Sequence, residues 1–299
     1  MHREILNFLK MNDVEYKEDG CLAEISTIKI GPNAFVITYP NSIHKLILLL
    51  IFLIDHKIRY KILGRMSNVL ITDDFYDGVI VRTDRLNDFS IDHNVVTAHC
   101  GISLPYLCNV LCKAELSGIE GLSGIPGSIG GALFGNAGAF GYEIGDRVIS
   151  VDCFDVKSRS IITVKADDIE FSYRHSKFKD GGLVILSVRL LLEKSDYDSI
   201  KKEIDRCRGI RMQTQPTDKP SLGSAFKRLG NGLFAAKLID DCGLKGYSVG
   251  GAQISTKHAG FIINNGGATA KDYIDLSNIA IEKVYERYKI LLEKEVEIV

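Results

Sequence analysis

The sequence predicts a mixed α+β protein. Two segments, residues 104–116 and 270–292, have apolar residues at the spacing of an amphipathic helix. Three others, residues 148–156, 160–164 and 184–192, are short and rich in β-branched residues, which is typical of strands. The connections between these three strands are short enough for antiparallel pairing. No internal repeat or low-complexity segment accompanies them.

The length and the charge limit the possible classes of protein. With 299 residues, the chain is longer than one ordinary domain, which indicates two or three domains. The 37 Lys and Arg residues balance the 38 Asp and Glu residues, so the formal net charge is −1. Composition therefore gives no argument for a nucleic-acid partner or an acidic membrane surface.

The cysteines and the N-terminus indicate a cytoplasmic protein without a metal site. The seven cysteines are odd in number and include no CxxC pair, which argues against a disulfide framework and against a zinc site. No signal peptide is visible at residues 1–12. The apolar run at residues 46–54 has nine residues, whereas a membrane span needs about 20. We therefore expect this run to form a buried helix.

The N-terminal part of the chain is expected to alternate helices and strands. A short helix is predicted at residues 5–9, and strands at residues 26–30 and 34–40. A helix then begins near Ser42 and carries the apolar run, and residues 60–81 follow as strand, loop and strand.

The C-terminal part begins with a polar, charged helix at residues 195–211, which we take as the domain boundary. Beyond it, the pattern predicts a helix at residues 234–242 capped by Gly243, a strand at residues 261–264 and the long helix at residues 270–292.

A glycine-rich stretch follows the first long helix, for which Gly118 is the expected C-cap. Ten of the 28 residues from 118 to 145 are glycine. Backbone of this kind approaches a ligand closely and offers N–H groups to phosphate oxygens. Structural turns remain the alternative. A second loop, at residues 64–68, could join it in binding a long diphosphate such as a flavin cofactor, although an ordinary turn has the same composition.

Five motifs carry a resemblance to a known family. They are GIPGSIGGALFGNAGAFGYEIGD (residues 124–146), FSYRHSKFK (171–179), PSLGSAFKR (220–228), GLKGYSVGGAQISTKHAGFIINNGGATAKD (243–272) and LEKEV (292–296). In this order they resemble the successive motifs of the UDP-N-acetylenolpyruvoylglucosamine reductases, the flavoenzymes of bacterial peptidoglycan synthesis. With residues 64–68 they span most of the chain from Tyr60 onward.

The resemblance implies an architecture and an activity. It implies a two-part FAD-binding unit of the vanillyl-alcohol oxidase-like type at residues 1–196, split near residue 83. A C-terminal α+β substrate-binding domain would follow at residues 197–299, with its tail returning to the active site. The implied reaction converts UDP-N-acetylglucosamine enolpyruvate to UDP-N-acetylmuramate with FAD as cofactor and NADPH as reductant. The chain resembles the shorter form of the family, and we expect a monomer.

Two other functions remain open. The alternative is another FAD-linked oxidoreductase of the same fold that acts on a different small substrate. A protein that binds a flavin or a nucleotide sugar without catalysis ranks third. Neither would need the motifs around Ser224 and Glu295.

The resemblance also selects cofactor-binding residues. Met66 departs from the family, which usually has glycine or a small residue at this position. The residues expected to bind FAD are Gly64, Arg65, Met66, Ser67, Asn68, Gly124, Ile125, Pro126, Gly127, Ser128, Gly130, Gly131, Asn136, Ala137 and Gly138.

The reaction needs a cation, a hydrogen-bond donor and a proton source. Hydride addition to the β carbon of the enol ether leaves negative charge on the α carbon and its carboxylate. By the resemblance, Arg174 is the cation and Ser224 donates the proton to the α carbon. The tail offers Glu293, Glu295 and Glu297 on one face of a strand, and the family pattern selects Glu295. Its implied role is to stay protonated, through a raised pKa, and to donate to the enolate.

Three further residues are expected to bind the anionic nucleotide sugar. They are Tyr173, Lys227 and Arg228. Some members of the family carry asparagine at the position of Arg228, so the family pattern supports this contact less than the contact of Lys227.

Overall fold

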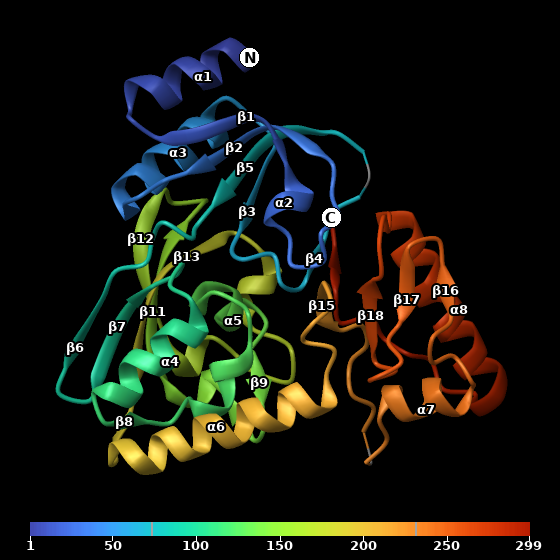
Figure 1. Ribbon diagram of the computed structural model, residues 1–299. Helices are drawn as coiled ribbons and strands as arrows, with labels where there is room; N and C mark the ends of the chain where they lie inside the picture. The colour runs from blue at the N-terminus through green and yellow to red at the C-terminus, as the bar shows by residue number, and fades with distance from the viewer. Residues whose placement is uncertain (73, 231) are drawn as a thin grey trace. The chain divides into compact units, whose positions relative to one another are not determined.

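The computed structural model describes residues 1–72, 74–230 and 232–299. The chain forms two compact units, which we call unit 1 and unit 2 (Figure 1). Unit 1 comprises Met1–Asp19, Phe35–Arg65 and Asp77–Gly209, and unit 2 comprises Gly20–Ala34, Met66–Tyr76 and Ile210–Val299. The expected domain limits, 1–196 with a split near 83 and 197–299, stay a prediction.

One four-stranded sheet lies mostly in unit 1 and has the order β1-β2-β5-β3, with β3 parallel to β5. Ser42 caps α3 through its side chain, and Leu46, Leu49, Leu50 and Leu53 form the buried face of this helix. This spacing is that of one helical face, so the predicted buried helix is confirmed. The elements are α1 (His2–Met11), β1 (Glu15–Cys21), β2 (Asn33–Tyr39), α3 (Ile43–Asp55), β3 (Tyr60–Leu63) and β5 (Tyr76–Arg82).

The strand predicted at residues 26–30 is wrong. These residues form no strand, and Lys29 has a left-handed φ of 60°. Ile28 and Ile30 alternate because both are buried in the core of unit 2. The sequence pattern missed β1 and the short helix α2 (Leu22–Ile25). Since β1 lies at the edge of its sheet and is largely exposed, its polar sequence lacks the apolar alternation of a strand.

The second sheet of unit 1 has five strands in the order β12-β11-β13-β7-β6, and every neighbouring pair is antiparallel. The three strands predicted in this region are therefore confirmed. Its strands are β6 (Phe89–Asp92), β7 (Val95–His99), β11 (Val148–Asp155), β12 (Ser160–Lys165) and β13 (Leu183–Leu191).

Short elements pack against the five-stranded sheet, through contacts of α5 (Ile129–Phe134) with β13 and β7. Helix α4 (Leu104–Lys113) ends three residues earlier than predicted, because Leu116–Ser117 forms β8 and pairs with β14 (Glu193–Lys194). The glycine-rich stretch then contributes η1 (Glu120–Gly124), α5 (Ile129–Phe134), β9 (Gly138–Ala139), β10 (Tyr142–Glu143) and η2 (Ile144–Arg147). Two 3-10 turns, η3 (Ala166–Asp168) and η4 (Lys177–Asp180), precede β13.

Unit 2 contains a four-stranded sheet in the order β15-β18-β17-β16, against which α8 packs. Helix α8 ends at Tyr288 because Lys289 takes a left-handed φ of 57°, so the predicted end at residue 292 is wrong. The elements are β4 (Val69–Leu70), β15 (Ser221–Ser224), α7 (Ala235–Asp241), β16 (Ser248–Val249), β17 (Ala252–Ile254), β18 (Phe261–Asn264), α8 (Ala270–Tyr288) and β19 (Glu297–Ile298).

Helix α6 (Tyr197–Thr214) is the predicted polar helix, and the division between the units falls within it, at Gly209 and Ile210. Strand β19 pairs in parallel with β4, both in unit 2. Among the described residues, no helix is long and apolar enough to cross a membrane.

Gly101 provides a stability prediction for unit 1. A Cβ atom at this position would lie 1.7 Å from the backbone oxygen of Thr83, which cannot move aside like a side chain. We expect Gly101→Ala to lower the free energy of unfolding by about 3 kcal/mol. In contrast, Gly209→Ala in α6 meets nothing within 4 Å and is expected to raise this free energy by about 1 kcal/mol. Urea midpoints measure both changes, and equal midpoints for the two variants would contradict the prediction.

Candidate cofactor and substrate site

Several glycines of the glycine-rich stretch are required by close packing within unit 1. A Cβ atom at Gly121 would lie 2.4 Å from the ring of Tyr142, and one at Gly130 would lie 2.9 Å from the Cβ atom of Cys100. Both contacts are too short for any side chain at the glycine. Part of the glycine content therefore has a structural cause, as the alternative interpretation of the sequence held.

The two predicted phosphate-binding loops meet at Gly64 and Ser128. A Cβ atom at Gly64 would lie 2.4 Å from Oγ of Ser128, so only glycine permits this approach. The Ser128 side chain caps α5 by accepting a hydrogen bond from the backbone N–H of Gly131. Both loops belong to unit 1 at these positions.

This junction has hydrogen-bond donors to offer. Within the described parts of the chain, the backbone N–H groups of Gly64, Arg65 and Ser128 have no acceptor. The buried hydroxyl of Ser123, one residue before the Gly124 loop, also has no partner there. Unpaired backbone N–H groups next to a glycine are what a pyrophosphate requires. The donor set is thus compatible with the diphosphate of FAD.

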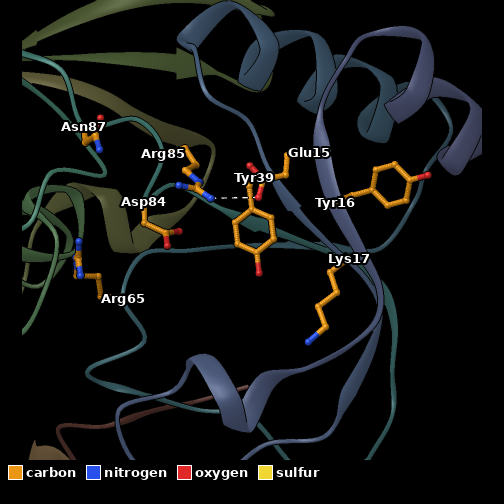
Figure 2. Close-up of a pocket in the computed structure, with 8 residues that line it drawn as sticks. All are labelled: Glu15, Tyr16, Lys17, Tyr39, Arg65, Asp84, Arg85 and Asn87. Carbon is orange, nitrogen blue, oxygen red and sulfur yellow. Dashed lines mark hydrogen bonds and ion pairs between the residues drawn. The ribbon is translucent and has the colours of Figure 1, made fainter.

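Arg65 is one of the residues that line a cavity of about 520 Å³, and all of these residues belong to unit 1 (Figure 2). Two acidic side chains in its wall are already paired with arginines: Glu15 with Arg85 at 3.1 Å, and Asp84 with Arg82 at 3.0 Å. Among the described residues, the Arg65 guanidinium has neither a hydrogen bond nor an ion pair. It is therefore available to a phosphate oxygen.

The rest of the 64–68 loop belongs to unit 2. Met66 is buried and has a left-handed φ of 50°, a conformation that favours glycine. A methionine takes this conformation here, with its side chain packed inside the unit. Asn68 donates through Nδ2 to the backbone oxygen of Glu295 at 3.1 Å. The loop is thus bonded directly to the tail.

The other predicted cofactor residues lie in unit 1, in the glycine-rich stretch. Gly124 ends η1, residues 125–128 connect it to α5, and the following residues continue through α5 to β9. They are Gly124, Ile125, Pro126, Gly127, Gly130, Gly131, Asn136, Ala137 and Gly138.

Arg174 lies in a tight turn of unit 1. The turn is closed by two hydrogen bonds of 3.1 Å between the backbone groups of Ser172 and His175. Arg174 has a left-handed φ of 56°, which is uncommon for a residue other than glycine, asparagine or aspartate. Its Nη2 donates to the backbone oxygen of Gly138 at 3.1 Å, and its Cζ lies 5.1 Å from the ring centroid of Tyr173. Such conformations recur at functional sites, and the catalytic role of Arg174 stays a prediction.

Ser224 ends β15 at an irregularity in the sheet of unit 2. Between the pairs Ser221 with Ile263 and Ser224 with Phe261, β15 has one residue more than its partner strand. Gly223 has a φ of 80° at this bulge. A bulge of this kind re-aims the next side chain and is frequent beside active sites. The half-buried Ser224 hydroxyl has no hydrogen-bond partner among the residues that the structure describes.

The C-terminal tail pairs with the residues that follow Ser224. The N–H of Glu295 donates to the oxygen of Ala225 at 2.9 Å, and the N–H of Lys227 donates to the oxygen of Glu293 at 2.9 Å. Lys294 forms an antiparallel bridge with Phe226. The structure therefore brings the Ser224 and Glu295 segments together, within one unit and across about 70 residues of chain.

Lys227 is engaged by the tail. Its Nζ lies 2.8 Å from Oε2 of Glu293. This hydrogen bond raises the pKa of Lys227 and lowers the pKa of Glu293, so both groups are charged at neutral pH. Arg228 is exposed, and so is much of the Tyr173 side chain.

The predicted catalytic residues divide between the units. Arg174 and the glycine-rich stretch belong to unit 1, whereas Ser224, Glu295, Lys227 and Asn68 belong to unit 2. The sequence pattern missed two contributors to this geometry. Gly223 provides the bulge, and the Asn68 side chain holds the tail at Glu295. A glycine directly before the serine was the available signal for the first, whereas nothing local could indicate the second.

Comparisons with known proteins define the class. Residues 34–164 match an FAD binding domain. The structure of wild-type BBE-like 1 from Physcomitrella patens is 13% identical with a TM-score of 0.50, and the match covers 65% of this chain and 44% of that one. At this identity only the fold is shared. The chain is thus an FAD-binding protein of the vanillyl-alcohol oxidase-like fold.

The particular family follows from closer relatives. Residues 215–299 match the "UDP-N-acetylenolpyruvoylglucosamine reductase, C-terminal domain". A reductase of this name from Caldicellulosiruptor bescii is 41% identical over 294 residues, 98% of this chain and 93% of the relative. The crystal structure of the reductase from Thermus caldophilus is 30% identical with a TM-score of 0.80, covering 95% of this chain and 98% of that one. The chain belongs to the UDP-N-acetylenolpyruvoylglucosamine reductase family.

Proposed function

We propose that this protein reduces UDP-N-acetylglucosamine enolpyruvate to UDP-N-acetylmuramate with FAD and NADPH, in peptidoglycan precursor synthesis. The single observation that carries the proposal is the pairing of the Ser224 and Glu295 segments through the Glu295 N–H and the Ala225 oxygen, at 2.9 Å, in a member of this family.

Residues of both loops hold the cofactor in this proposal. The N–H groups of Gly64, Arg65 and Ser128 bind the FAD pyrophosphate, and the Arg65 guanidinium balances its charge. The other predicted residues of the two loops line the cofactor, apart from Met66 and Asn136, whose side chains are buried inside the protein. Bound FAD supplies the transfer of a hydride from NADPH to the β carbon of the enolpyruvyl group.

Residues of the chain bind the substrate carboxylate, stabilise the negative charge that develops on the substrate, and supply the proton to the α carbon. Arg174 binds the substrate carboxylate, because its planar guanidinium matches a carboxylate and stays charged. Ser224 donates a proton to the α carbon as negative charge develops there. A hydroxyl is a weak acid, so its position against that carbon must provide the effect. The Glu295 carboxyl donates to the enolate oxygen and stabilises it.

Substrate binding and cellular context complete the proposal. Tyr173, Lys227 and Arg228 contact the nucleotide-sugar diphosphate, and Lys227 exchanges Glu293 for a phosphate oxygen. We also propose that the protein is a cytoplasmic monomer. The seven cysteines support a reducing compartment, since all of them are free thiols.

The flavin itself tests the proposed function. We expect the purified protein to be yellow, to lose this colour when NADPH is added without oxygen, and to regain it when the enolpyruvyl substrate follows. Flavin absorbance measures each step. A colourless protein that takes up no added FAD would contradict the proposed function. If the reduced flavin were reoxidised by oxygen but not by the enolpyruvyl substrate, the proposed substrate would be wrong.

A further inference from the structure

Asn136 is buried at the point where three segments of unit 1 meet. Only 1% of its surface is exposed, and its φ of 42° is left-handed. Its Nδ2 donates to Oε2 of Glu143 at 2.8 Å and to the backbone oxygen of Ser172 at 3.0 Å. Its Oδ1 accepts from the N–H of Gly145 at 3.1 Å. The carboxamide nitrogen and oxygen of Asn136 are therefore both hydrogen-bonded within the protein.

These bonds connect the glycine-rich stretch to the turn that carries Arg174. Ser172 is the first residue of that turn, and its oxygen also accepts from the N–H of His175. Glu143 pairs with Gly138 in the β9–β10 hairpin, and the Gly138 oxygen accepts from the Arg174 guanidinium. Asn136 thus holds Arg174 at two points. It holds the backbone of the turn through Ser172, and it holds the Arg174 guanidinium through the β9–β10 hairpin.

We propose that Asn136 is a positioning residue for Arg174 and that Glu143 is its necessary partner. This inference rests on the proposed function, because Arg174 is there the group that binds the substrate carboxylate. Only an amide satisfies the site, since it provides two donors for Glu143 and Ser172 and one acceptor for Gly145. Glycine at position 145 is also required, because a Cβ atom there would lie 2.9 Å from Oδ1 of Asn136.

Asn136→Asp gives a pH-dependent test. One oxygen of the new carboxylate would keep the Gly145 N–H as its donor, whereas the other would face the Glu143 carboxylate and the Ser172 oxygen with no proton to donate. A nearby like charge raises a carboxyl pKa above the ordinary value of about 3.9, so protonation restores one donor as the pH falls. We expect reoxidation of the flavin by the enolpyruvyl substrate to be about 100-fold slower than in the wild type at pH about 8. This deficit should shrink as the pH is lowered toward about 5.5.

Matched variants separate positioning from loss of packing. Asn136→Ala should show the deficit without recovery at low pH. The double variant Asn136→Asp with Glu143→Gln restores a donor opposite the new carboxylate and should lose the pH dependence. Asn94→Asp is the control, since Asn94 donates through Nδ2 to a single backbone oxygen, that of Leu192, at 3.0 Å. It should behave like the wild type at every pH.

Hydrogen exchange gives a measurement independent of turnover. In the FAD-loaded protein, Asn136→Ala should speed exchange of the Ser172 and His175 amides by about tenfold or more, whereas Asn94→Asp should not. A deficit of Asn136→Asp that is the same at all pH values would overturn the proposal. So would loss of FAD affinity in Asn136→Ala with normal substrate reoxidation, which would make Asn136 a cofactor ligand only. Failure of the wild type to bind FAD or to turn over would instead contradict the proposed function.

Discussion

Ser224→Ala is expected to leave flavin reduction by NADPH nearly unchanged and to slow reoxidation by the enolpyruvyl substrate by about 10²–10⁴-fold. The two half-reactions differ because only the second requires a proton at the α carbon. The geometry supports this role, since the bulge at Gly223 sets the direction of a half-buried hydroxyl that has no partner among the described residues. Anaerobic stopped-flow absorbance measures both half-reactions separately.

A serine on the same strand is the matched control. Ser221 begins β15 and pairs with Ile263, before the bulge. Ser221→Ala should leave both half-reactions within about threefold of the wild type, as is usual for a substitution that removes no buried bond. If Ser224→Ala slowed both half-reactions equally, the hydroxyl would act in the structure or in flavin binding and not as the proton donor.

Elements with strong local patterns were predictable. Helix α3 follows from its capping Ser42 and its four buried leucines, and β11 to β13 follow from β-branched residues with short connections. The edge strand β1 was not predictable, because an exposed edge imposes no apolar alternation on the sequence. The end of α8 was missed for a related reason, since the left-handed Lys289 has no glycine to mark it.

The candidate site was predictable as residues but not as contacts. The motifs selected Ser224 and Glu295, yet nothing local indicates that the N–H of Glu295 bonds to Ala225. The glycine-rich stretch was only partly understood. Gly121 and Gly130 are needed for packing, whereas the junction of Gly64 with Ser128 has donors without acceptors in the described chain. Composition alone cannot separate these two uses of glycine.

The tail carries the second large prediction, because three glutamates alternate there and only one is expected to act. Leu292 and Val296 are buried in the core of unit 2, and they fix the register of the residues between them. Glu293 is 69% exposed in its side chain and is paired with Lys227, which lowers its pKa. The Glu293 carboxylate is therefore exposed and engaged by the Lys227 ammonium. Glu295, held by Ala225 and Asn68, remains the candidate acid.

Glu295→Gln should therefore slow reoxidation by the substrate by about 10²–10⁴-fold and leave reduction by NADPH nearly intact. Glutamine keeps the size of the side chain and the backbone bonds of the tail, so the loss reports the missing proton. Glu293→Gln removes an exposed, solvent-screened ion pair and should change either half-reaction by less than about fivefold. The reverse result, a mild Glu295→Gln and a severe Glu293→Gln, would mean that the functional tail is displaced by two residues, since that shift exchanges the two carboxylates on one face of a strand.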